Sequence, residues 1–338
     1  MTEFFRAMMR NIGHDLSLAA SFVLFCLLAS TAGATVPDAP RGAFLGVPSA
    51  ILYDLDTEAV LFEQNADARI PPASLAKVLS MFLALDHVGS GLAGFDSTVG
   101  VSREAASEGG SRMGLKANDR VVLHDLLLGM AVSSGNDAST AVAEFVGGSA
   151  TAFVRMMNVK ARRLGMRDSN FRNPHGLPHQ EQYTTARDML TLARAYLRAY
   201  PFALRFHNTH ALRYRSSVTW NKNPLLGQYE GADGLKTGWI KDSGYNLIFT
   251  ASHGKKRLLA VIMGAPDVGT RGSEACRLLD AGFLVSGNQA VSVASALYNA
   301  PLPQRSLDLK KNAHEAGVYR TAKSIPRNGQ AIRRNRGK

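Results

Sequence analysis

The sequence predicts an α+β fold (an α/β sandwich), in which an antiparallel sheet is flanked by terminal helices and carries an inserted helical lobe. Strand patterns lie at both ends of the body of the chain, at 49–63 and 245–263, whereas helical patterns fill the middle, from 121 to 197. Because 46% of the 338 residues are hydrophobic, the chain can bury a core of the size that such a fold needs.

The first part of the body is expected to begin with a hairpin. Two short runs of strand-forming residues, 49–54 and 59–63, flank a polar turn. The apolar run 78–85 predicts a helix that starts near Ser74, directly after a pair of prolines. A short strand is expected at 97–101.

The middle of the body shows the spacing of amphipathic helices. Apolar residues predict helices at 121–130, 138–145 and 151–164, and Gly165 supplies a stop for the third. A further helix is expected to run from 185 to about 197.

Strand patterns return in the last part of the body. Strand character at 234–239 and 245–251 is followed by a turn at 253–256 and a strand at 257–263. A helix at 273–283 closes the body.

The chemistry of the chain is organised around Ser74 and Lys77. Residues three positions apart share one face of a helix, so the Lys77 amine can reach the Ser74 hydroxyl. The unpaired N–H groups at a helix start favour negative charge on such a serine. Taken alone the spacing is a weak signal, because Ser252 and Lys255 repeat it in a predicted turn.

Two further motifs follow in order, Ser134-Gly135-Asn136 and Lys236-Thr237-Gly238. This order of three motifs is typical of serine β-lactamases and penicillin-binding proteins. In such a site Ser74 attacks a carbonyl carbon, and Lys77 acts as the base only when its amine is neutral. Ser134 then passes a proton to the leaving nitrogen, and Asn136 holds Lys77 and a substrate amide.

The third motif supplies binding groups. Lys236 contributes positive charge and Thr237 a hydroxyl for a substrate carboxylate, and Gly238 permits a close approach of the backbone. The N–H groups of Ser74 and Trp239 are expected to form the oxyanion hole.

From about residue 49 to 283 the chain resembles the D-alanyl-D-alanine carboxypeptidases, the small serine penicillin-binding proteins. The resemblance implies a serine β-lactamase/DD-peptidase-like fold and removal of the terminal D-alanine from peptidoglycan pentapeptide stems. It also implies inhibition by β-lactams, with no metal and no cofactor. Besides the three motifs it rests on Leu164-Gly165-Met166, Asn173-Pro174-His175-Gly176-Leu177, Tyr183-Thr184-Thr185-Ala186-Arg187-Asp188, Asn221-Lys222-Asn223-Pro224-Leu225-Leu226 and Gly244-Tyr245-Asn246.

The chain departs from the pattern of this family at three points. Trp239 stands where a histidine is frequent, which alters the shape of the site but not the backbone N–H. Lys222 stands where an arginine is frequent, and we expect it to help hold the terminal carboxylate, less rigidly than an arginine fork. Many relatives also carry a second, β-rich domain; only 55 residues follow Phe283 here, with a polar and basic tail, so we expect this domain to be absent or vestigial.

Three other functions are related to this one. A DD-endopeptidase differs only in the acceptor side of its substrate, and an inactive peptidoglycan-binding module would lack the catalytic groups. A β-lactamase of class A needs a deacylating glutamate, but the surroundings of Glu181 do not match its Glu-x-x-Leu-Asn pattern. His175 and His179 are spaced like a zinc pair, but Pro178 argues against a helix there, so no metal site is expected.

The N-terminus of the chain predicts export. Residues 1–34 are expected to be a cleaved signal peptide, with a retained membrane anchor as the alternative, and 35–43 a linker. The catalytic domain is expected at 44–284, in the periplasm or on the outer face of the bacterial cytoplasmic membrane. Residues 285–338 form an extension that is predicted to be disordered from about 303.

Charge is concentrated in that extension. Residues 303–338 hold 10 Lys and Arg against 2 Asp and Glu, so they carry +8 of the net charge of +12. Loose contact with anionic envelope polymers or lipids is expected of this tail, and nucleic acid is not an expected partner of an exported protein.

Four remaining residues are interpreted as structural. Asp188 is expected to stabilise a helix start, and Cys276 to be a buried apolar residue that, after loss of Cys26 with the signal peptide, has no disulfide partner. His207 and His210 are expected on the surface.

Overall fold

The structure is a computed structural model that describes residues 44–285 and 291–299. The predicted signal peptide, the linker and the basic tail from 303 lie outside the described residues. Within the described ranges, no helix is both long enough and apolar enough to cross a membrane.

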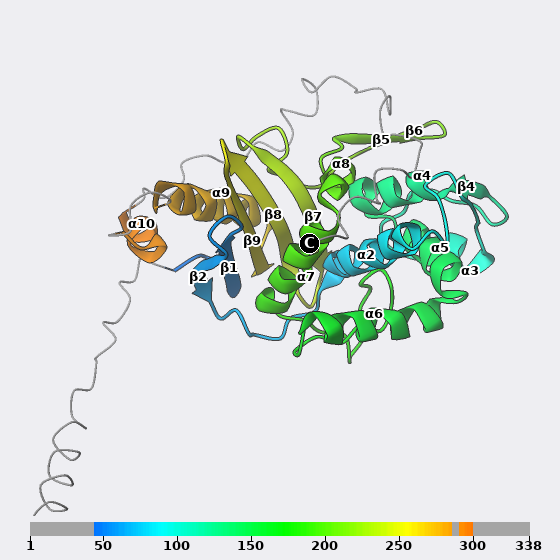
Figure 1. Ribbon diagram of the computed structural model, residues 1–338, viewed down its shortest axis with the longest axis horizontal. Coiled ribbons are helices and arrows are strands. Elements are labelled where there is room, and N and C mark those ends of the chain that lie inside the picture. Colours follow the sequence, from blue (N-terminus) through cyan, green and yellow to red (C-terminus); the bar gives the residue numbers. More distant parts are fainter. Residues whose placement is uncertain (1–43, 286–290, 300–338) are drawn as a thin grey trace, which may run out of the picture. The chain divides into compact units, whose positions relative to one another are not determined.

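A five-stranded sheet forms the centre of the fold, with the order β2-β1-β9-β8-β7 and antiparallel pairing throughout (Figure 1). The first strand pairs with the last, so that Ile51 lies opposite Val261. This pairing confirms a sheet assembled from both ends of the body. Its strands are β1 (Ser49–Asp54), β2 (Ala59–Gln64), β7 (Ala232–Ile240), β8 (Gly244–His253) and β9 (Lys256–Ala265).

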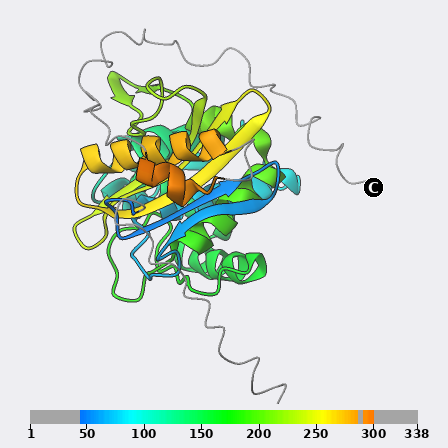
Figure 2. The ribbon, with the colours of Figure 1, turned by 90° about the vertical axis from the view of Figure 1, so that its left-hand side faces the viewer.

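Both faces of this sheet are buried, because successive side chains of a strand point to opposite faces. On β9, Leu259 and Val261 pack into a core shared with the helical lobe, whereas Leu258 and Ala260 pack into a second core. The second core is covered by α9 (Val268–Val285) and α10 (Val293–Asn299), which cross the face of the sheet that Figure 2 presents.

The helical lobe is inserted between β2 and β7, and α2 (Ala76–Gly89) runs through its interior with most side chains buried. Two small hairpins, β3 (Thr98–Gly100) with β4 (Arg120–Val122) and β5 (Ala211–Tyr214) with β6 (Ser217–Trp220), belong to this inserted segment. Its other helices are α3 (Arg103–Ser107), α4 (Leu123–Leu128), α5 (Asn136–Gly147), α6 (Ala150–Leu164), α7 (Ala186–Ala199) and α8 (Leu204–His207).

Local signals set the ends of the predicted helices. Ser149 and Thr185 cap the N-termini of α6 and α7 through their hydroxyl groups, and Gly165 ends α6 with a φ of 86°. Asp188 lies in the first turn of α7 and accepts hydrogen bonds from the Asp168 N–H and the Ser169 hydroxyl. The expected position of Asp188 at a helix start is therefore confirmed, and its carboxylate bonds the segment 168–169.

Three expectations were wrong or incomplete, and one hairpin was not expected. Residues 121–122 belong to β4 and not to a helix, because the β-branched pair Val121-Val122 pairs with β3 before α4 begins. His207 was expected on the surface but is fully buried, and its two ring nitrogens bond to the Tyr196 hydroxyl and the Leu235 carbonyl oxygen. Cys276 is only half-buried, and the β5–β6 hairpin was not predicted.

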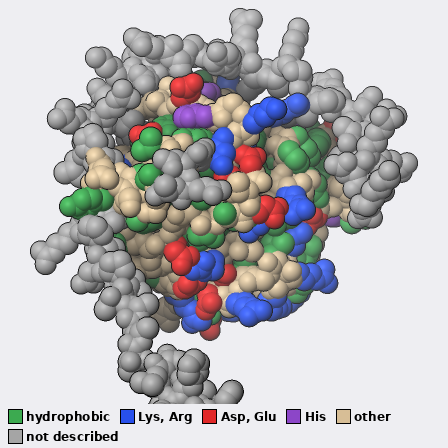
Figure 3. Space-filling view, turned by 60° about the vertical axis from the view of Figure 1, so that its left-hand side comes forward, with side chains coloured by type: hydrophobic (Ala, Val, Ile, Leu, Met, Phe, Trp, Pro, Cys, Tyr) green, Lys and Arg blue, Asp and Glu red, His purple; other side chains and the backbone are tan. Residues whose placement is uncertain are grey.

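The surface of the described part carries mixed charge. Basic and acidic side chains are interspersed on the face shown in Figure 3. Arg187 on α7, for example, pairs with Glu63 on β2 and with Asp67. Exposed pairs of this kind contribute at most about 1 kcal/mol each, so the two buried cores dominate stability.

Candidate active site

Ser74 lies in a single 3₁₀ turn, Ala73–Leu75, that leads directly into α2. The turn packs against β7 at Gly238, where a β-carbon would lie 3.1 Å from both the Ser74 nitrogen and the Pro72 carbonyl oxygen. Only a glycine permits this approach without displacing the turn. The motif glycine therefore sets how closely the strand edge and the serine approach each other.

The Lys77 side chain is fully buried, and its Nζ atom has three oxygen partners. Nζ lies 3.0 Å from Ser74 Oγ and 2.7 Å from both Asn136 Oδ1 and the His175 carbonyl oxygen. Three partners in hydrogen-bond range leave the amine little freedom to rotate away from the serine.

The surroundings of Lys77 favour its neutral form. They hold its pKa well below the ordinary value of a lysine, first because burial disfavours the ammonium ion and then because Lys236 and Lys222 are nearby cations. A neutral amine has a lone pair that can accept the hydroxyl proton of Ser74. The geometry thus meets the condition that a lysine base requires.

Ser134 and Asn136 lie on either side of a sharp bend. A π-helical turn, Gly129–Ser133, ends at Ser134, which takes a left-handed φ of 58°, and α5 begins at Asn136. Asn136 Nδ2 donates to the Gly109 carbonyl oxygen at 2.6 Å, which turns its Oδ1 toward Lys77. The bend brings both motif side chains to the site from one short segment.

Lys236 is buried on β7, where its Nζ donates to the Thr237 carbonyl oxygen at 3.0 Å. Burial, followed by repulsion from Lys222 and Arg271, lowers the pKa of Lys236 to about 7. A carboxylate bound beside it would favour the charged form. This strand edge is therefore suited to binding an anion.

A cavity of about 710 Å³ opens in front of the serine. Lys77 bonds to Ser74 and to Asn136, and Lys236 bonds to the Thr237 carbonyl oxygen, so these three buried side chains adjoin residues of the cavity lining. The structure therefore brings all nine residues predicted for the site to one place. Six of the nine line the cavity: Ser74, Ser134, Lys222, Thr237, Gly238 and Trp239.

Lys222 and Trp239 lie on the outer part of this cavity. Lys222 Nζ donates to Ser111 Oγ at 2.8 Å, and burial lowers its pKa. The Trp239 side chain is 55% exposed, and its ring centroid lies 5.7 Å from that of Tyr245. Both departures from the family pattern therefore lie at the rim of the site, and the charge of Lys222 also acts on the buried base Lys77.

Arg271, at the start of α9, was not selected from the sequence. It is buried, lines the same cavity, and places its guanidinium carbon 5.7 Å from the centre of the Tyr245 ring. Burial lowers its pKa to about 10, and among the described residues no partner bonds its Nε atom. The sequence feature that could have indicated Arg271 is its position between small residues near the start of a predicted helix.

Residues 40–267 match the family model of peptidase S11, which is described as D-alanyl-D-alanine carboxypeptidase. The chain belongs to this family. The S11 match covers every predicted site residue from Ser74 to Trp239 and ends just before Arg271. The resemblance inferred from the motifs is confirmed.

Two curated S11 relatives show the extent of the similarity. D-alanyl-D-alanine carboxypeptidase DacF of Bacillus subtilis is 36% identical over 240 residues, which cover 70% of this chain and 61% of the relative. D-alanyl-D-alanine carboxypeptidase DacD of Escherichia coli is 35% identical over 271 residues, covering 78% and 70%. The chain thus spans 61% and 70% of the lengths of these two relatives.

Solved structures confirm the fold. Penicillin-binding protein 5 from Haemophilus influenzae superposes with a TM-score of 0.69 at 32% identity, over 71% of this chain and 72% of that one. Penicillin-binding protein 6B from Escherichia coli gives 0.68 at 34% identity, over 73% and 80%. Penicillin-binding protein D2 from Listeria monocytogenes, in its ampicillin-bound form, gives 0.65 at 27% identity, over 71% and 98%.

Proposed function

We propose that the chain is a serine-type D-Ala-D-Ala carboxypeptidase that removes the terminal D-alanine from peptidoglycan pentapeptide stems. The observation that carries the proposal is the position of the buried Lys77 amine, 3.0 Å from the Ser74 hydroxyl oxygen. The names of the S11 relatives support the choice of substrate.

In the proposed acylation step, neutral Lys77 takes the hydroxyl proton as Ser74 Oγ attacks the carbonyl carbon of the penultimate D-alanine. The carbonyl oxygen becomes an oxyanion, which the N–H groups of Ser74 and Trp239 stabilise. Collapse of this intermediate breaks the C–N bond. Ser134 passes the proton to the departing nitrogen, D-alanine leaves, and the stem remains esterified to Ser74.

The terminal carboxylate of the substrate selects this bond for cleavage. Thr237, Lys222 and Arg271 line the cavity beside Ser74, and Lys236 lies behind Thr237. Three basic side chains in a partly buried site attract one carboxylate strongly, because the low local dielectric strengthens charge interactions. Deacylation then requires a water molecule, which transfers a proton to Lys77 and releases the shortened stem.

β-Lactams are proposed inhibitors of the same serine. Opening of the lactam ring by Ser74 would form an acyl-enzyme whose amine remains tethered, which slows its departure. The ampicillin-bound relative from Listeria supports this expectation. Fast hydrolysis of the adduct is not expected, because Glu181 is exposed and lies 3.5 Å from Arg172, outside the cavity lining.

The test uses a labelled penicillin and a diacyl-Lys-D-Ala-D-Ala peptide with the wild-type protein and Ser74→Ala. We expect a stable adduct and release of D-alanine, both lost in the variant. Rapid penicillin turnover would indicate a β-lactamase, and cleavage of cross-linked dimers in preference to the peptide would indicate a DD-endopeptidase. Release of D-alanine by Ser74→Ala would refute the mechanism.

We further propose residues 44–284 as the catalytic domain, acting outside the cytoplasm in the bacterial envelope. The family match over 40–267 and the clustering of all nine site residues within this range support the domain boundary. Fractionation of cells that produce the full chain tests the location, and activity confined to the cytoplasmic fraction would contradict it.

A further inference from the structure

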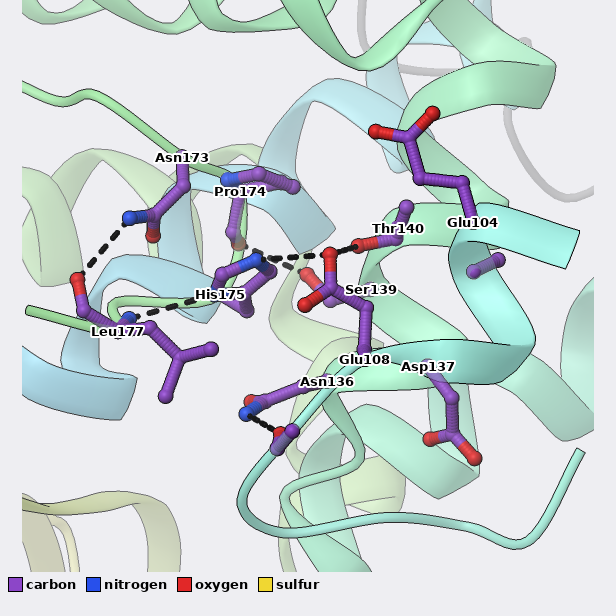
Figure 4. Close-up of polar contacts among 12 residues, drawn as sticks. Glu104, Glu108, Asn136, Asp137, Ser139, Thr140, Asn173, Pro174, His175 and Leu177 are labelled. Carbon is purple, nitrogen blue, oxygen red and sulfur yellow. Dashed lines mark hydrogen bonds and ion pairs between the residues drawn. The ribbon is translucent and has the colours of Figure 1, made fainter.

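The half-buried Glu108 and the buried His175 form a polar pair close to the proposed base, in a part of the site that none of the three motifs covers. The His175 ring is buried, and its Nε2 atom lies 3.2 Å from Glu108 Oε1 (Figure 4). The same carboxylate oxygen accepts a hydrogen bond from Thr140 Oγ1 at 2.8 Å. The pair therefore links the end of α3, the loop 173–178 and α5.

The hydrogen bonds determine the tautomer of the ring. The Leu177 backbone N–H donates to His175 Nδ1 at 3.2 Å, so Nδ1 carries no proton. Nε2 then carries the proton and donates it to Glu108. The bond to His175 lowers the pKa of Glu108, and burial lowers the pKa of His175, so a carboxylate faces a neutral imidazole.

Both chain segments that this pair joins supply backbone acceptors to the site. The His175 carbonyl oxygen accepts from Lys77 Nζ at 2.7 Å. Gly109, directly after Glu108, accepts from Asn136 Nδ2 at 2.6 Å, and Asn136 in turn binds Lys77. The two segments thus hold the base from two directions, and the Glu108–His175 bond joins them side chain to side chain.

The loop 173–178 is also fixed against the serine turn. Gly176, at a φ of 91°, passes so close to the Ala73 carbonyl group that a β-carbon there would overlap it. Ser80 on α2 and Ser139 on α5 both donate to the Pro174 carbonyl oxygen, at 2.6 and 2.7 Å. A shift of this loop therefore moves the groups around Ser74 and Lys77 together.

We propose that Glu108 and His175 are positioning residues that clamp these two segments and thereby hold Lys77 and Asn136 in the geometry needed for acylation of Ser74. This inference rests on the proposed function, because one of its readouts is the rate of Ser74 acylation. Glu108 has a second effect, because its negative charge opposes the lowering of the Lys77 pKa.

The pKa of Lys77 also depends on charged groups from the other elements packed around it. Around Lys77 these are Lys236, Lys222, Asp137 and Glu108. Around Glu108 they are His175, Lys77 and Glu144. Removing the Glu108 charge leaves Lys77 with fewer opposing anions, so its amine becomes neutral at a lower pH.

The experiment compares Glu108→Ala, Glu108→Gln and the matched control Glu104→Ala in the full chain. Glu104 lies on α3, which ends directly before Glu108 in the chain, and carries the same charge, but it is exposed and points away from His175 (Figure 4). The readouts are the rate of Ser74 acylation by a labelled penicillin across pH, and amide hydrogen exchange of the peptides covering 109–113 and 174–177.

We expect Glu108→Ala to slow acylation about tenfold or more and to speed exchange in both peptides, because small displacements of a base are costly. Glu108→Gln keeps an oxygen acceptor for His175 Nε2, so it should restore most of the acylation rate and of the protection from hydrogen exchange. Because it removes the negative charge, it should also move the acid limb of the acylation rate to lower pH. Glu104→Ala should match the wild type.

Three results would overturn the clamp. These are wild-type acylation and exchange in Glu108→Ala, an equal loss in Glu104→Ala, and failure of Glu108→Gln to restore either readout. If the wild-type protein forms no adduct and releases no D-alanine, the proposed function fails. Hydrogen exchange alone then decides, and unchanged exchange in Glu108→Ala refutes the clamp.

Discussion

The Nζ atom of Lys77 lies 3.0 Å from the Oγ atom of Ser74, and the lysine side chain has no exposure to solvent. Burial and the cations Lys236 and Lys222 lower the pKa of Lys77, so the amine can lose its proton at a pH where a surface lysine stays charged. This relationship between base and nucleophile leads to the first prediction.

The acid limb of kcat/KM for D-alanine release should follow deprotonation of Lys77. Because only the neutral amine accepts the Ser74 proton, activity rises with pH through a pKa well below that of an ordinary lysine. Steady-state rates across pH, with circular dichroism to verify folding, check this. A limb at the ordinary lysine value would contradict the role of Lys77.

The alkaline limb should follow Lys236, whose pKa lies at about 7 in the unliganded site. A bound carboxylate favours the ammonium form, so binding above that pH takes up a proton and weakens as pH rises. Calorimetry of a carboxylate ligand in two buffers of different ionisation enthalpy measures the uptake. Lys236→Met is the control, and equal uptake in this variant would assign the proton to another group.

Gly238→Ala should slow acylation of Ser74 by about tenfold to a hundredfold with little change in melting temperature. The added β-carbon would lie 3.1 Å from the Ser74 nitrogen, so the turn and the strand must separate slightly. Acylation by a labelled penicillin provides the measurement. Gly100→Ala, at a position with no atom within 4 Å of the new carbon, is the matched control.

Arg271→Ala should lower kcat/KM for the peptide by about 30-fold or more, since a buried cation facing a carboxylate is worth at least about 2 kcal/mol. Arg271→Lys keeps the charge but loses the planar fork, so only part of the loss should be recovered. Arg205→Ala, an exposed arginine on α8, should behave as the wild type. Equal rates for Arg271→Ala and Arg205→Ala would exclude carboxylate binding by Arg271.

Features encoded by neighbouring residues were predictable from the sequence. Two strand-forming runs around a polar turn specified the β1–β2 hairpin, 3–4 spaced apolar residues specified α6, and Gly165 specified where α6 ends. The motif residues could also be selected, because the chemistry of Ser74 and Lys77 depends partly on a spacing of three within one helix start. Their order in the chain then indicated the family.

What the sequence by itself determined is the set of local elements and the identity of the reacting groups. Only the tertiary structure decided that His207 is buried, that Arg271 faces the cavity, and that Glu108 joins His175 across 67 positions of the chain. It also decided that Lys77 meets Asn136 and His175, which lie 59 and 98 positions away. The reason is physical, because burial and the resulting pKa of an amine depend on groups that only long-range packing brings together.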